Sequence, residues 1–390
     1  MTHSLLTRRA EFLPLSRATI TDDELKAVEE VLKSGWLTTG SKVQQFEENM
    51  QQYLGIHKAV GLTSCTAGLH IALLTLGVGP GDEVIVPAYT FVATAHVVEW
   101  VGAKPVIVDV EKDTFNLDPE KVESAITSKT KAIIPVHFAG HSCDMDKIMD
   151  IARRYNLAVI EDAAHAIGTE YKGKKIGNFG EITVFSFYVT KTMTTAEGGM
   201  AVTNDPRLGK KLKSRSYFGM DKDAFNRYSE KGTWYYEILD LGYKYNMDNI
   251  RGALGIEQLK KLGTFITKRR EIAQYYNNLL KEVPGIITPQ EKGYTHHSYH
   301  LYPVLIEPEV LGLNRDYLID KLKEWNIGTS VHFIPLHFHP YYKKKYQYCR
   351  GDFPVAEWLF EREVSLPLFP EMSLEDAEYV VRCIREIIKR

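Results

Sequence analysis

The clearest chemical signal in the sequence is a carboxylate and a lysine that follow two apolar segments. The stretch LAVIEDAAHAIG (157–168) ends a strand-like run at Glu161 and Asp162, and VFSFYVTKTMTTAEGGM (184–200) follows another with a loop that holds Lys191. Ligands of α/β sheets bind at the carboxyl ends of strands, so both side chains could face one cleft. Taken separately, such an Asp is usually a turn residue and such a Lys is usually solvated.

Together, the two residues suit the chemistry of pyridoxal 5′-phosphate (PLP). This cofactor needs a lysine for a Schiff base and a carboxylate that keeps its ring nitrogen protonated. The lysine, once displaced by a substrate amine, can move a proton as general base. Ser186, five residues before Lys191, could donate its hydroxyl to the cofactor phosphate. We therefore predict Lys191 and Asp162 as the catalytic residues.

A phosphate-binding helix N-terminus is expected in VGLTSCTAGLHIALLTLG (60–77). A strand, a Ser/Thr cluster and a helix follow one another there, which places hydroxyls and backbone N–H groups of Ser64, Thr66 and Ala67 at the start of the helix. On its own, this pattern is more often a plain N-cap. Its position upstream of Asp162 and Lys191 favours the phosphate site.

Other motifs carry weaker signals. Phe91 in PAYTFVATA could stack on the cofactor ring, although an aromatic at a helix start is more often core. The cluster of His332, His337 and His339 lacks a carboxylate at matching spacing, which favours cleft-lining or core histidines over zinc. Walker, GxSxG and HExxH motifs are absent from the sequence. No metal site is predicted.

These residues must be positioned by alternating strands and helices. Between about 58 and 204, seven short apolar runs alternate with amphipathic stretches such as TAGLHIALLTLG and MDKIMDIARRYN. That alternation predicts βαβ units around a mostly parallel sheet buried on both faces. An additional helix is expected over residues 22–35, where the apolar positions fall on one face.

The chain after residue 205 becomes helical and then mixed. The pattern predicts long helices over 251–262 and 266–283 joined around Gly263, followed by sparser elements: a strand at 299–307, a helix at 314–326, a short strand at 328–333 and a helix at 374–390. We therefore predict a large cofactor-binding α/β domain over residues 1–260 and a smaller α+β domain over residues 261–390.

Composition restricts the class of protein. The 390 residues include 48 Lys plus Arg and 50 Asp plus Glu, and this balance argues against nucleic acid or an anionic membrane as a bulk partner. The sequence has no signal-peptide pattern in its first twenty residues and no apolar run long enough for a membrane span. Its four cysteines form no CxxC pair, so a cytoplasmic protein without disulfides is expected.

Seven stretches in order, SGWLTTG, TSCTAGLHIAL, GDEVIVPAYTFVATA, VIEDAAHAIG, FSFYVTKTMTTAEGGM, LGYKYNMDNIRGALGIEQL and VSLPLFP, resemble the DegT/DnrJ/StrS family of nucleotide-sugar aminotransferases. The resemblance covers about residues 12–388. Within the family, the chain looks most like the enzymes that make UDP-4-amino-4-deoxy-L-arabinose and those that aminate UDP-4-keto-6-deoxyhexoses. The resemblance implies the aspartate-aminotransferase-like architecture (PLP fold type I) and a homodimer with active sites at the subunit interface.

The resemblance also assigns roles to individual residues. Lys191 matches the Schiff-base lysine, Asp162 the partner of the ring nitrogen, and His165 the residue beside the ring 3-hydroxyl. Phe91 matches the stacking aromatic, and the phosphate site is matched by Thr66, Ala67 and Ser186.

Four positions bear on how closely the chain follows the family. GYKYN matches a loop, often GYNYR, that reaches the neighbouring subunit's cofactor phosphate, so Lys244 and Asn246 are both candidates for that contact. Cys65 stands where many relatives have Gly. Dehydratase relatives carry His in place of the Schiff-base lysine, whereas this chain keeps Lys191, which favours transamination.

The function expected from the sequence is a ping-pong aminotransferase. L-Glutamate would convert PLP to the pyridoxamine form (PMP) and leave as 2-oxoglutarate, and the amine would pass to a nucleotide-linked sugar, such as a UDP-4-keto sugar, for polysaccharide or lipopolysaccharide biosynthesis. The residues expected around the sugar nucleotide are Trp36, Thr38, Thr39, Tyr188, His332 and His337. The alternatives are a non-catalytic PLP-binding regulator and another fold-type-I reaction, such as decarboxylation or desulfuration.

Overall fold

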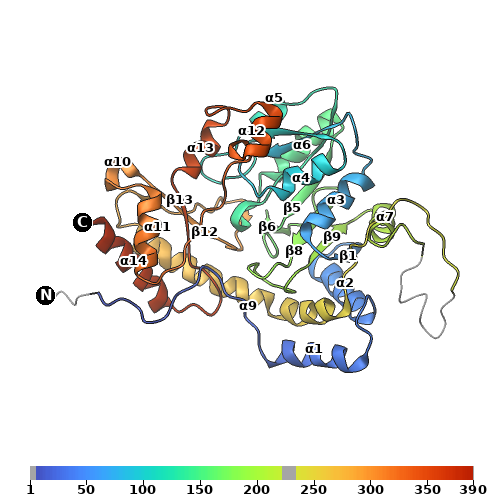
Figure 1. Cartoon of the computed structure of the whole chain (residues 1–390), viewed down its shortest axis with the longest axis horizontal. Helices are drawn as coiled ribbons and strands as arrows, with labels where there is room; N and C mark the ends of the chain where they lie inside the picture. Colours follow the sequence, from blue (N-terminus) through green and yellow to red (C-terminus); the bar gives the residue numbers. More distant parts are fainter. Residues whose placement is uncertain (1–5, 222–233, 390) are drawn as a thin grey trace.

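A central sheet of seven strands forms the middle of the molecule (Figure 1). The computed structural model describes residues 6–221 and 234–389. The strands lie in the order β1-β9-β8-β5-β4-β2-β3, and their bounds are β1 Lys58–Leu62, β2 Glu83–Pro87, β3 Lys104–Val108, β4 Thr130–Ile133, β5 Ala158–Ala163, β8 Ile182–Ser186 and β9 Gly199–Thr203. All neighbours are parallel except β9, which is antiparallel to β8 and β1. The prediction of a mostly parallel sheet is confirmed.

Helices cover both faces of this sheet. In β2, Val84 and Val86 face a core shared with α3, while Ile85 between them faces the core shared with α2 and α6. This alternation buries the strands on both faces, which explains their continuous apolar sequences. The helices of this part of the chain are α1 Asp22–Ser34, α2 Ser41–Leu54, α3 Cys65–Thr75, α4 Ala93–Trp100, α5 Pro119–Ser124, α6 Met145–Tyr155 and α7 Pro206–Ser216.

A single helix, α9 (Asn249–Leu280), links the two parts of the molecule. Its 32 residues span about 48 Å, and Figure 1 shows it running from beneath α2 toward α14. Ile256 and Leu262 pack into the core beneath the large sheet, whereas Tyr276 and Leu280 belong to a third core in the small lobe. The prediction of two helices joined around Gly263 is wrong, because a single exposed glycine costs a long helix only about 1 kcal/mol.

The small lobe is built on a three-stranded antiparallel sheet in the order β10-β12-β13. Its elements are β10 Ile286–Ile287, β12 Tyr302–Ile306, α10 Pro308–Leu311, α11 Arg315–Glu324, α12 Pro340–Tyr346, α13 Pro354–Phe360, β13 Glu363–Leu366 and α14 Leu374–Ile388. A further small sheet joins β11 (Thr295–His296) to β6 (Glu170–Tyr171) and β7 (Lys174–Lys175). The boundary predicted between residues 260 and 261 falls inside α9, and it stays a prediction.

The strand predicted at 328–333 does not form. The Gly328 N–H donates to the Leu13 carbonyl at 2.8 Å, and Ser330 makes only an isolated bridge to Ser365. Because the backbone partners come from two different segments, this stretch crosses between them instead of joining one sheet. Among the helices of the described ranges, none is both long and apolar enough to cross a membrane.

Candidate active site

A cavity of about 470 Å³ lies at the carboxyl ends of β5 and β8, bordered by residues of the small lobe. Asp162 and Lys191 both line it. The other residues predicted from the sequence that line the same cavity are Ser64, Thr66, Phe91, His165, Ser186, Tyr188 and His332. The structure thus brings both catalytic candidates together with most of the predicted cofactor residues.

Asp162 is held on β5 by two hydrogen-bond donors. Its Oδ2 accepts a hydrogen bond from Thr94 Oγ1 at 2.9 Å, and its Oδ1 accepts one from the Ala164 N–H at 3.1 Å. Thr94 Oγ1 in turn lies 2.9 Å from Thr90 Oγ1. Burial raises the pKa of Asp162 above its ordinary value, while these two bonds and the charge of Lys191 oppose the shift.

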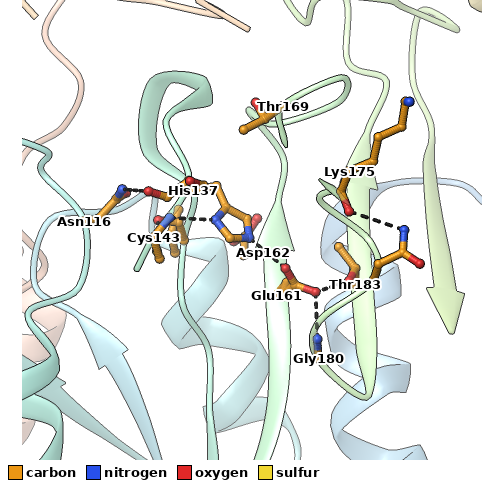
Figure 2. A network of polar contacts seen from close by, with 12 residues as sticks. Asn116, His137, Cys143, Glu161, Asp162, Thr169, Lys175, Gly180 and Thr183 are labelled. Atoms are coloured by element: carbon orange, nitrogen blue, oxygen red, sulfur yellow. Dashed lines mark hydrogen bonds and ion pairs between the residues drawn. The ribbon is translucent and has the colours of Figure 1, made fainter. Parts of the chain in front are cut away.

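Glu161, the neighbour of Asp162, points to the opposite face of β5 and belongs to a fully buried network (Figure 2). Its carboxylate lies 3.0 Å from His137 Nε2 and accepts bonds from Thr183 Oγ1 at 2.6 Å and the Gly180 N–H at 2.9 Å. Burial acts to raise the pKa of Glu161, but these partners hold it below its ordinary value.

The tautomer of His137 follows from its second contact. Its Nδ1 accepts a hydrogen bond from the Cys143 N–H at 3.1 Å, so a neutral ring carries its proton on Nε2, where it donates to Glu161 (Figure 2). The pair therefore joins β5 to the segment after β4. Glu161 stabilises the strand that carries Asp162 and does not reach the cavity.

Lys191 lies in a loop between β8 and β9 that is stabilised by backbone hydrogen bonds within the loop. The Lys191 N–H donates to the Tyr188 carbonyl, and the Thr195 N–H to the Phe187 carbonyl, each at 2.9 Å. Gln258 of α9 accepts from the Thr194 N–H at 3.2 Å. Burial lowers the pKa of Lys191 to about 8, with the charge of Asp162 opposing the shift. A substantial fraction of the amine is therefore neutral near pH 7 to 8.

The N-terminus of α3 forms one end of the cavity. Ser64 caps the helix, and its Oγ accepts a bond from the Ala67 N–H at 3.0 Å. The N–H groups of Cys65 and Thr66 precede the first possible intrahelical bond and are left for a ligand. Ala67 is buried and its N–H is committed to the cap, so the structure does not place Ala67 on the cavity wall.

A close approach of two backbones supports this helix terminus. A Cβ on Gly199 of β9 would lie 2.4 Å from the Ser64 carbonyl carbon and 2.5 Å from the Cys65 nitrogen. Only glycine lets the strand pass directly behind the start of α3. Ser186 of β8, which pairs with Gly199, therefore lies on the cavity wall beside Ser64.

Histidines from distant segments form another wall. The rings of His165 and His300 lie 4.4 Å apart, and His165 Nδ1 accepts from the Ala139 N–H at 3.2 Å, which places a neutral ring's proton on Nε2. Burial lowers the pKa of His165 well below its ordinary range and that of His332 to about 4, and the charge of Lys191 adds to both shifts. Both rings are therefore neutral at physiological pH.

Two aromatic side chains lie at the cavity with much of their surface free. Phe91 is 58% exposed and Tyr188 is 44% exposed, and the Phe91 ring lies 5.9 Å from that of Phe333. A core position for Phe91, which the sequence left open, is therefore excluded. Its face remains available to a planar ligand.

The remaining predicted residues form a second cluster away from this chain's own cavity. Asn246 Nδ2 donates to Thr39 Oγ1 at 2.6 Å, and Trp36 Nε1 donates to the Thr39 carbonyl at 3.1 Å. Thr38 is exposed beside them, and the Lys244 ammonium lies 4.3 Å from the centre of the Tyr217 ring. The structure brings Trp36, Thr39 and Asn246 together, whereas the Lys244 ammonium lies against Tyr217, and none of these residues lines the cavity that holds Lys191.

His337 was expected at the sugar site, and the structure places it elsewhere. It is 1% exposed, and its Nε2 lies 3.0 Å from Glu357 Oε1. Its partner lies on α13, and His337 is not among the residues that line the cavity.

The donor set of the cavity fits PLP. A phosphate matches the α3 N-terminus and the hydroxyls of Thr66 and Ser186, a pyridinium matches Asp162, and an aldehyde matches the neutral amine of Lys191. Within the described residues, no group of three or more His, Cys, Asp or Glu side chains could hold a metal ion.

The family follows from comparison with known proteins. The model of the DegT/DnrJ/EryC1/StrS aminotransferase family matches residues 18–385. The chain belongs to this family. Two curated relatives of this aminotransferase are SpsC of Bacillus subtilis, a spore coat polysaccharide biosynthesis protein, and the UDP-4-amino-4-deoxy-L-arabinose–oxoglutarate aminotransferase of Shewanella sediminis. SpsC is 47% identical and covers 99% of both chains, and the Shewanella enzyme is 44% identical over 97% of this chain and 98% of its own.

A solved structure with the same fold is Spr1654 of Streptococcus pneumoniae, described as a sugar aminotransferase. Its PMP form matches with a TM-score of 0.89 at 34% identity over 96% of this chain and 99% of that one. The same protein has also been solved in a PLP form. The predicted family, fold, transaminase activity and PLP cofactor are confirmed.

Among the residues at the aminotransferase site that the sequence did not identify are Thr94, Phe333 and His300. Thr94 is one of several threonines after β2, and nothing in its spacing indicates that its hydroxyl bonds Asp162. Phe333 carried no signal of its own. His300 precedes β12, and only the fold brings it to the cavity wall.

Proposed function

We propose that this aminotransferase moves the amino group of L-glutamate onto the keto group of a nucleotide-linked sugar, with a UDP-4-keto sugar as acceptor. The observation that carries the proposal is the shared cavity of Lys191 and Asp162 beside the open N-terminus of α3. The name of the Shewanella relative, which contains a UDP-linked sugar and oxoglutarate, supports this pair of substrates.

PLP supplies an aldehyde that condenses with amines and a ring that accepts the electrons of a broken C–H bond. Lys191 would hold the cofactor and, with its amine free, would move the proton between carbon atoms. Asp162 keeps the ring nitrogen protonated, and Thr94 and Ala164 orient its carboxylate. Ser64, Thr66 and Ser186 bind the phosphate together with the free N–H groups of α3.

Side chains of different elements would hold the ring of the cofactor. Phe91 would stack on it, and His165, whose Nε2 carries the ring proton, would donate a hydrogen bond to its 3-hydroxyl side. Tyr188 and His332 lie on the cavity wall where substrates must enter. Glutamate and the sugar would use this one cavity in turn.

The second cluster supports a homodimer with shared active sites. Trp36 and Asn246 both bond Thr39 outside their own chain's cavity, Thr38 precedes Thr39 in the chain, and Lys244 lies two residues before Asn246. In a two-fold dimer, such a cluster can complete the cavity of the partner subunit. We propose that Lys244 or Asn246 contacts the partner's cofactor phosphate and that Trp36, Thr38 and Thr39 border the sugar.

The cellular role proposed for the enzyme is amination of a sugar for a surface polysaccharide, including lipopolysaccharide, in the cytoplasm. SpsC, named for spore coat polysaccharide biosynthesis, supports the polysaccharide. The cysteines Cys65, Cys143, Cys349 and Cys383 are all free thiols, as expected in a reducing compartment.

The proposal is tested by offering the enzyme ¹⁵N-labelled L-glutamate and a panel of UDP- and dTDP-linked ketosugars, with product masses as the readout. We expect one UDP-4-keto sugar to gain a labelled amino group. Transfer to none of the ketosugars, as a non-catalytic regulator would show, or amination of a 3-keto sugar alone would contradict it.

A further inference from the structure

Three polar side chains connect β13 of the small lobe to the cavity. Ser365 Oγ donates to Glu363 Oε1 at 2.6 Å and lies 2.9 Å from His332 Nδ1, and the His332 N–H donates to Glu363 Oε2 at 2.8 Å. Glu363 and Ser365 are fully buried, whereas His332 lines the cavity. With Nδ1 engaged by Ser365, Nε2 is the ring nitrogen left for the cavity.

The protonation of Glu363 decides which nitrogen of His332 carries the ring proton. When Glu363 is ionised, the Ser365 hydroxyl donates to it, so His332 must donate from Nδ1 and offers a lone pair at Nε2. When Glu363 is protonated, it donates to Ser365, Ser365 donates to Nδ1, and the ring proton is on Nε2.

We propose that Glu363, Ser365 and His332 form a proton relay, in which His332 Nε2 exchanges a proton with the substrate in the cavity and Glu363 stores it. In the uptake direction, Nε2 gains a proton, the Nδ1 proton moves to Ser365, and the Ser365 hydroxyl proton moves to Glu363. His332 is neutral before and after, and the carboxylate becomes a carboxylic acid. No electrons are transferred.

Near neutral pH, Glu363 can be either ionised or protonated, whereas the His332 ring stays neutral. Burial raises the pKa of Glu363 to about 8, with its bonds to Ser365 and His332 and the charge of Arg315 opposing the shift. The pKa of His332 is about 4 because of burial and the charge of Lys191, so imidazolium is disfavoured. The relay therefore moves a proton without a charged ring.

The titratable groups around the relay come from several elements. On the cavity side, these are Lys191, His165 and His300. Behind Glu363 lie Tyr89 and Arg315. The positive charge of Lys191 lowers the pKa of His332 and so favours the neutral ring.

The relay rests on the proposed function. It supplies a second proton transfer while Lys191 is engaged in the first. Replacing a keto oxygen by nitrogen releases water, and the departing oxygen needs a proton. Lys191 is committed to the proton on carbon, whereas His332 opens on the same cavity from the opposite lobe. Glu363 and Ser365 act through His332 and are positioning residues.

The tautomer of His332 tests the relay directly. In ¹⁵N-histidine spectra of the holoenzyme, with the signal assigned through His332→Asn, the ring proton should move from Nε2 to Nδ1 as the pH rises through about 8. In Glu363→Gln, the amide oxygen accepts from the His332 N–H and its NH₂ donates to Ser365, which fixes the proton on Nε2 at all pH values. Ser365→Ala should remove the pH dependence.

A matched control is Glu357→Gln, which alters the buried carboxylate bonded to His337 outside the cavity. It should leave the His332 signals and the activity unchanged. Glu363→Gln should lower kcat about 100-fold with little change in KM, the size of effect expected for an acid–base group. A wild-type His332 that keeps one tautomer from about pH 6 to about pH 10, or a Glu363→Gln variant with the wild-type switch, would overturn the relay.

Failure of the relay and failure of the proposed function give different results. If no ketosugar is aminated but His332 switches its tautomer, the acceptor is wrong and the relay stands. If amination proceeds while His332 shows no switch, the relay alone is wrong.

Discussion

At the scale of single residues, burial sets the reactivity of Lys191. Its pKa of about 8, lowered by burial from 10.5, means that the folded protein loses this charge more readily than the unfolded chain. The unfolded chain then binds more protons between these two values, so Lys191 lowers stability most below pH 8 and the penalty disappears as the pH rises toward 10.5. The same burial that lowers stability keeps the Lys191 amine partly neutral near pH 8.

Attachment of the cofactor should follow this ionisation. Because only the neutral amine attacks an aldehyde, the rate at which PLP bonds Lys191 in cofactor-free protein should rise about tenfold per pH unit below the pKa and level off above it. Stopped-flow absorbance at the cofactor band measures this rate. A plateau reached only near pH 10.5, or a rate that does not change with pH, would contradict the assignment.

Thr94 provides a second prediction at this scale. Thr94→Val removes the 2.9 Å bond to Asp162 and should weaken PLP binding about 10- to 100-fold, because a bond to a charged group contributes about 1.5–3 kcal/mol. Thr94→Ser keeps the hydroxyl and should retain wild-type affinity. Fluorescence titration with PLP compares the three proteins, and equal affinity for the valine variant would show that Thr94 does not orient Asp162.

The chemistry of single residues was predictable where it follows a strand. Asp162 and Lys191 were found because apolar runs mark the strands that precede them. Thr94 was missed because its hydroxyl reaches Asp162 across 68 positions of the chain, a contact that no local pattern encodes. His337 was misplaced because burial against Glu357 cannot be read from its neighbours in the sequence.

At the scale of elements, the geometry of the α3 N-terminus depends on how closely β9 passes behind it. Gly199→Ala would place a methyl group against the backbone of Ser64 and Cys65, which no side-chain rearrangement can relieve. We expect a loss of about 1–3 kcal/mol in the free energy of unfolding and weaker PLP binding.

Gly263→Ala is the matched control. A Cβ there meets nothing within 4 Å, and the residue lies inside α9, so alanine should stabilise the protein by about 1 kcal/mol. Denaturant unfolding of the PLP-loaded enzymes measures both changes. If Gly199→Ala is as stable as the wild type, the close approach does not constrain the site.

The elements themselves were largely predictable, because buried parallel strands and amphipathic helices differ in their apolar period. One error came from backbone partners far apart in sequence, and the other from side-chain packing. The stretch 328–333 is apolar enough for a strand, but its bonds divide between Leu13 and Ser365. Gly263 resembles a break, yet the packing of Leu262 and Ile266 on either side of it holds one helix.

At the scale of the whole molecule, the predicted site residues other than His337 and Ala67 divide between the cavity and residues outside it. The cavity holds Lys191 and Asp162, while Trp36, Thr39 and Asn246 bond one another elsewhere. Spacing along the chain could not show this division, and only the resemblance of GYKYN to a family loop predicted that Lys244 and Asn246 reach a neighbouring subunit.

Shared sites predict complementation between two inactive variants. Lys191→Ala and the double variant Lys244→Ala/Asn246→Ala should each be inactive. Because a mixed dimer has one site with both the intact lysine and the intact loop, refolding the two together should restore about a quarter of wild-type activity. Size-exclusion chromatography confirms assembly, and a mixture with no more activity than its parts would place the loop in its own subunit's site.

The central claim is that this chain, through Lys191, takes an amino group from glutamate. It is tested most directly by mixing the PLP-loaded enzyme with L-glutamate alone and following the cofactor absorbance and the release of 2-oxoglutarate. The account predicts conversion to the PMP form with one 2-oxoglutarate per site, and no such conversion on the same timescale for Lys191→Ala. A wild-type enzyme that leaves glutamate unchanged, or a Lys191→Ala variant that reacts at the wild-type rate, would contradict it.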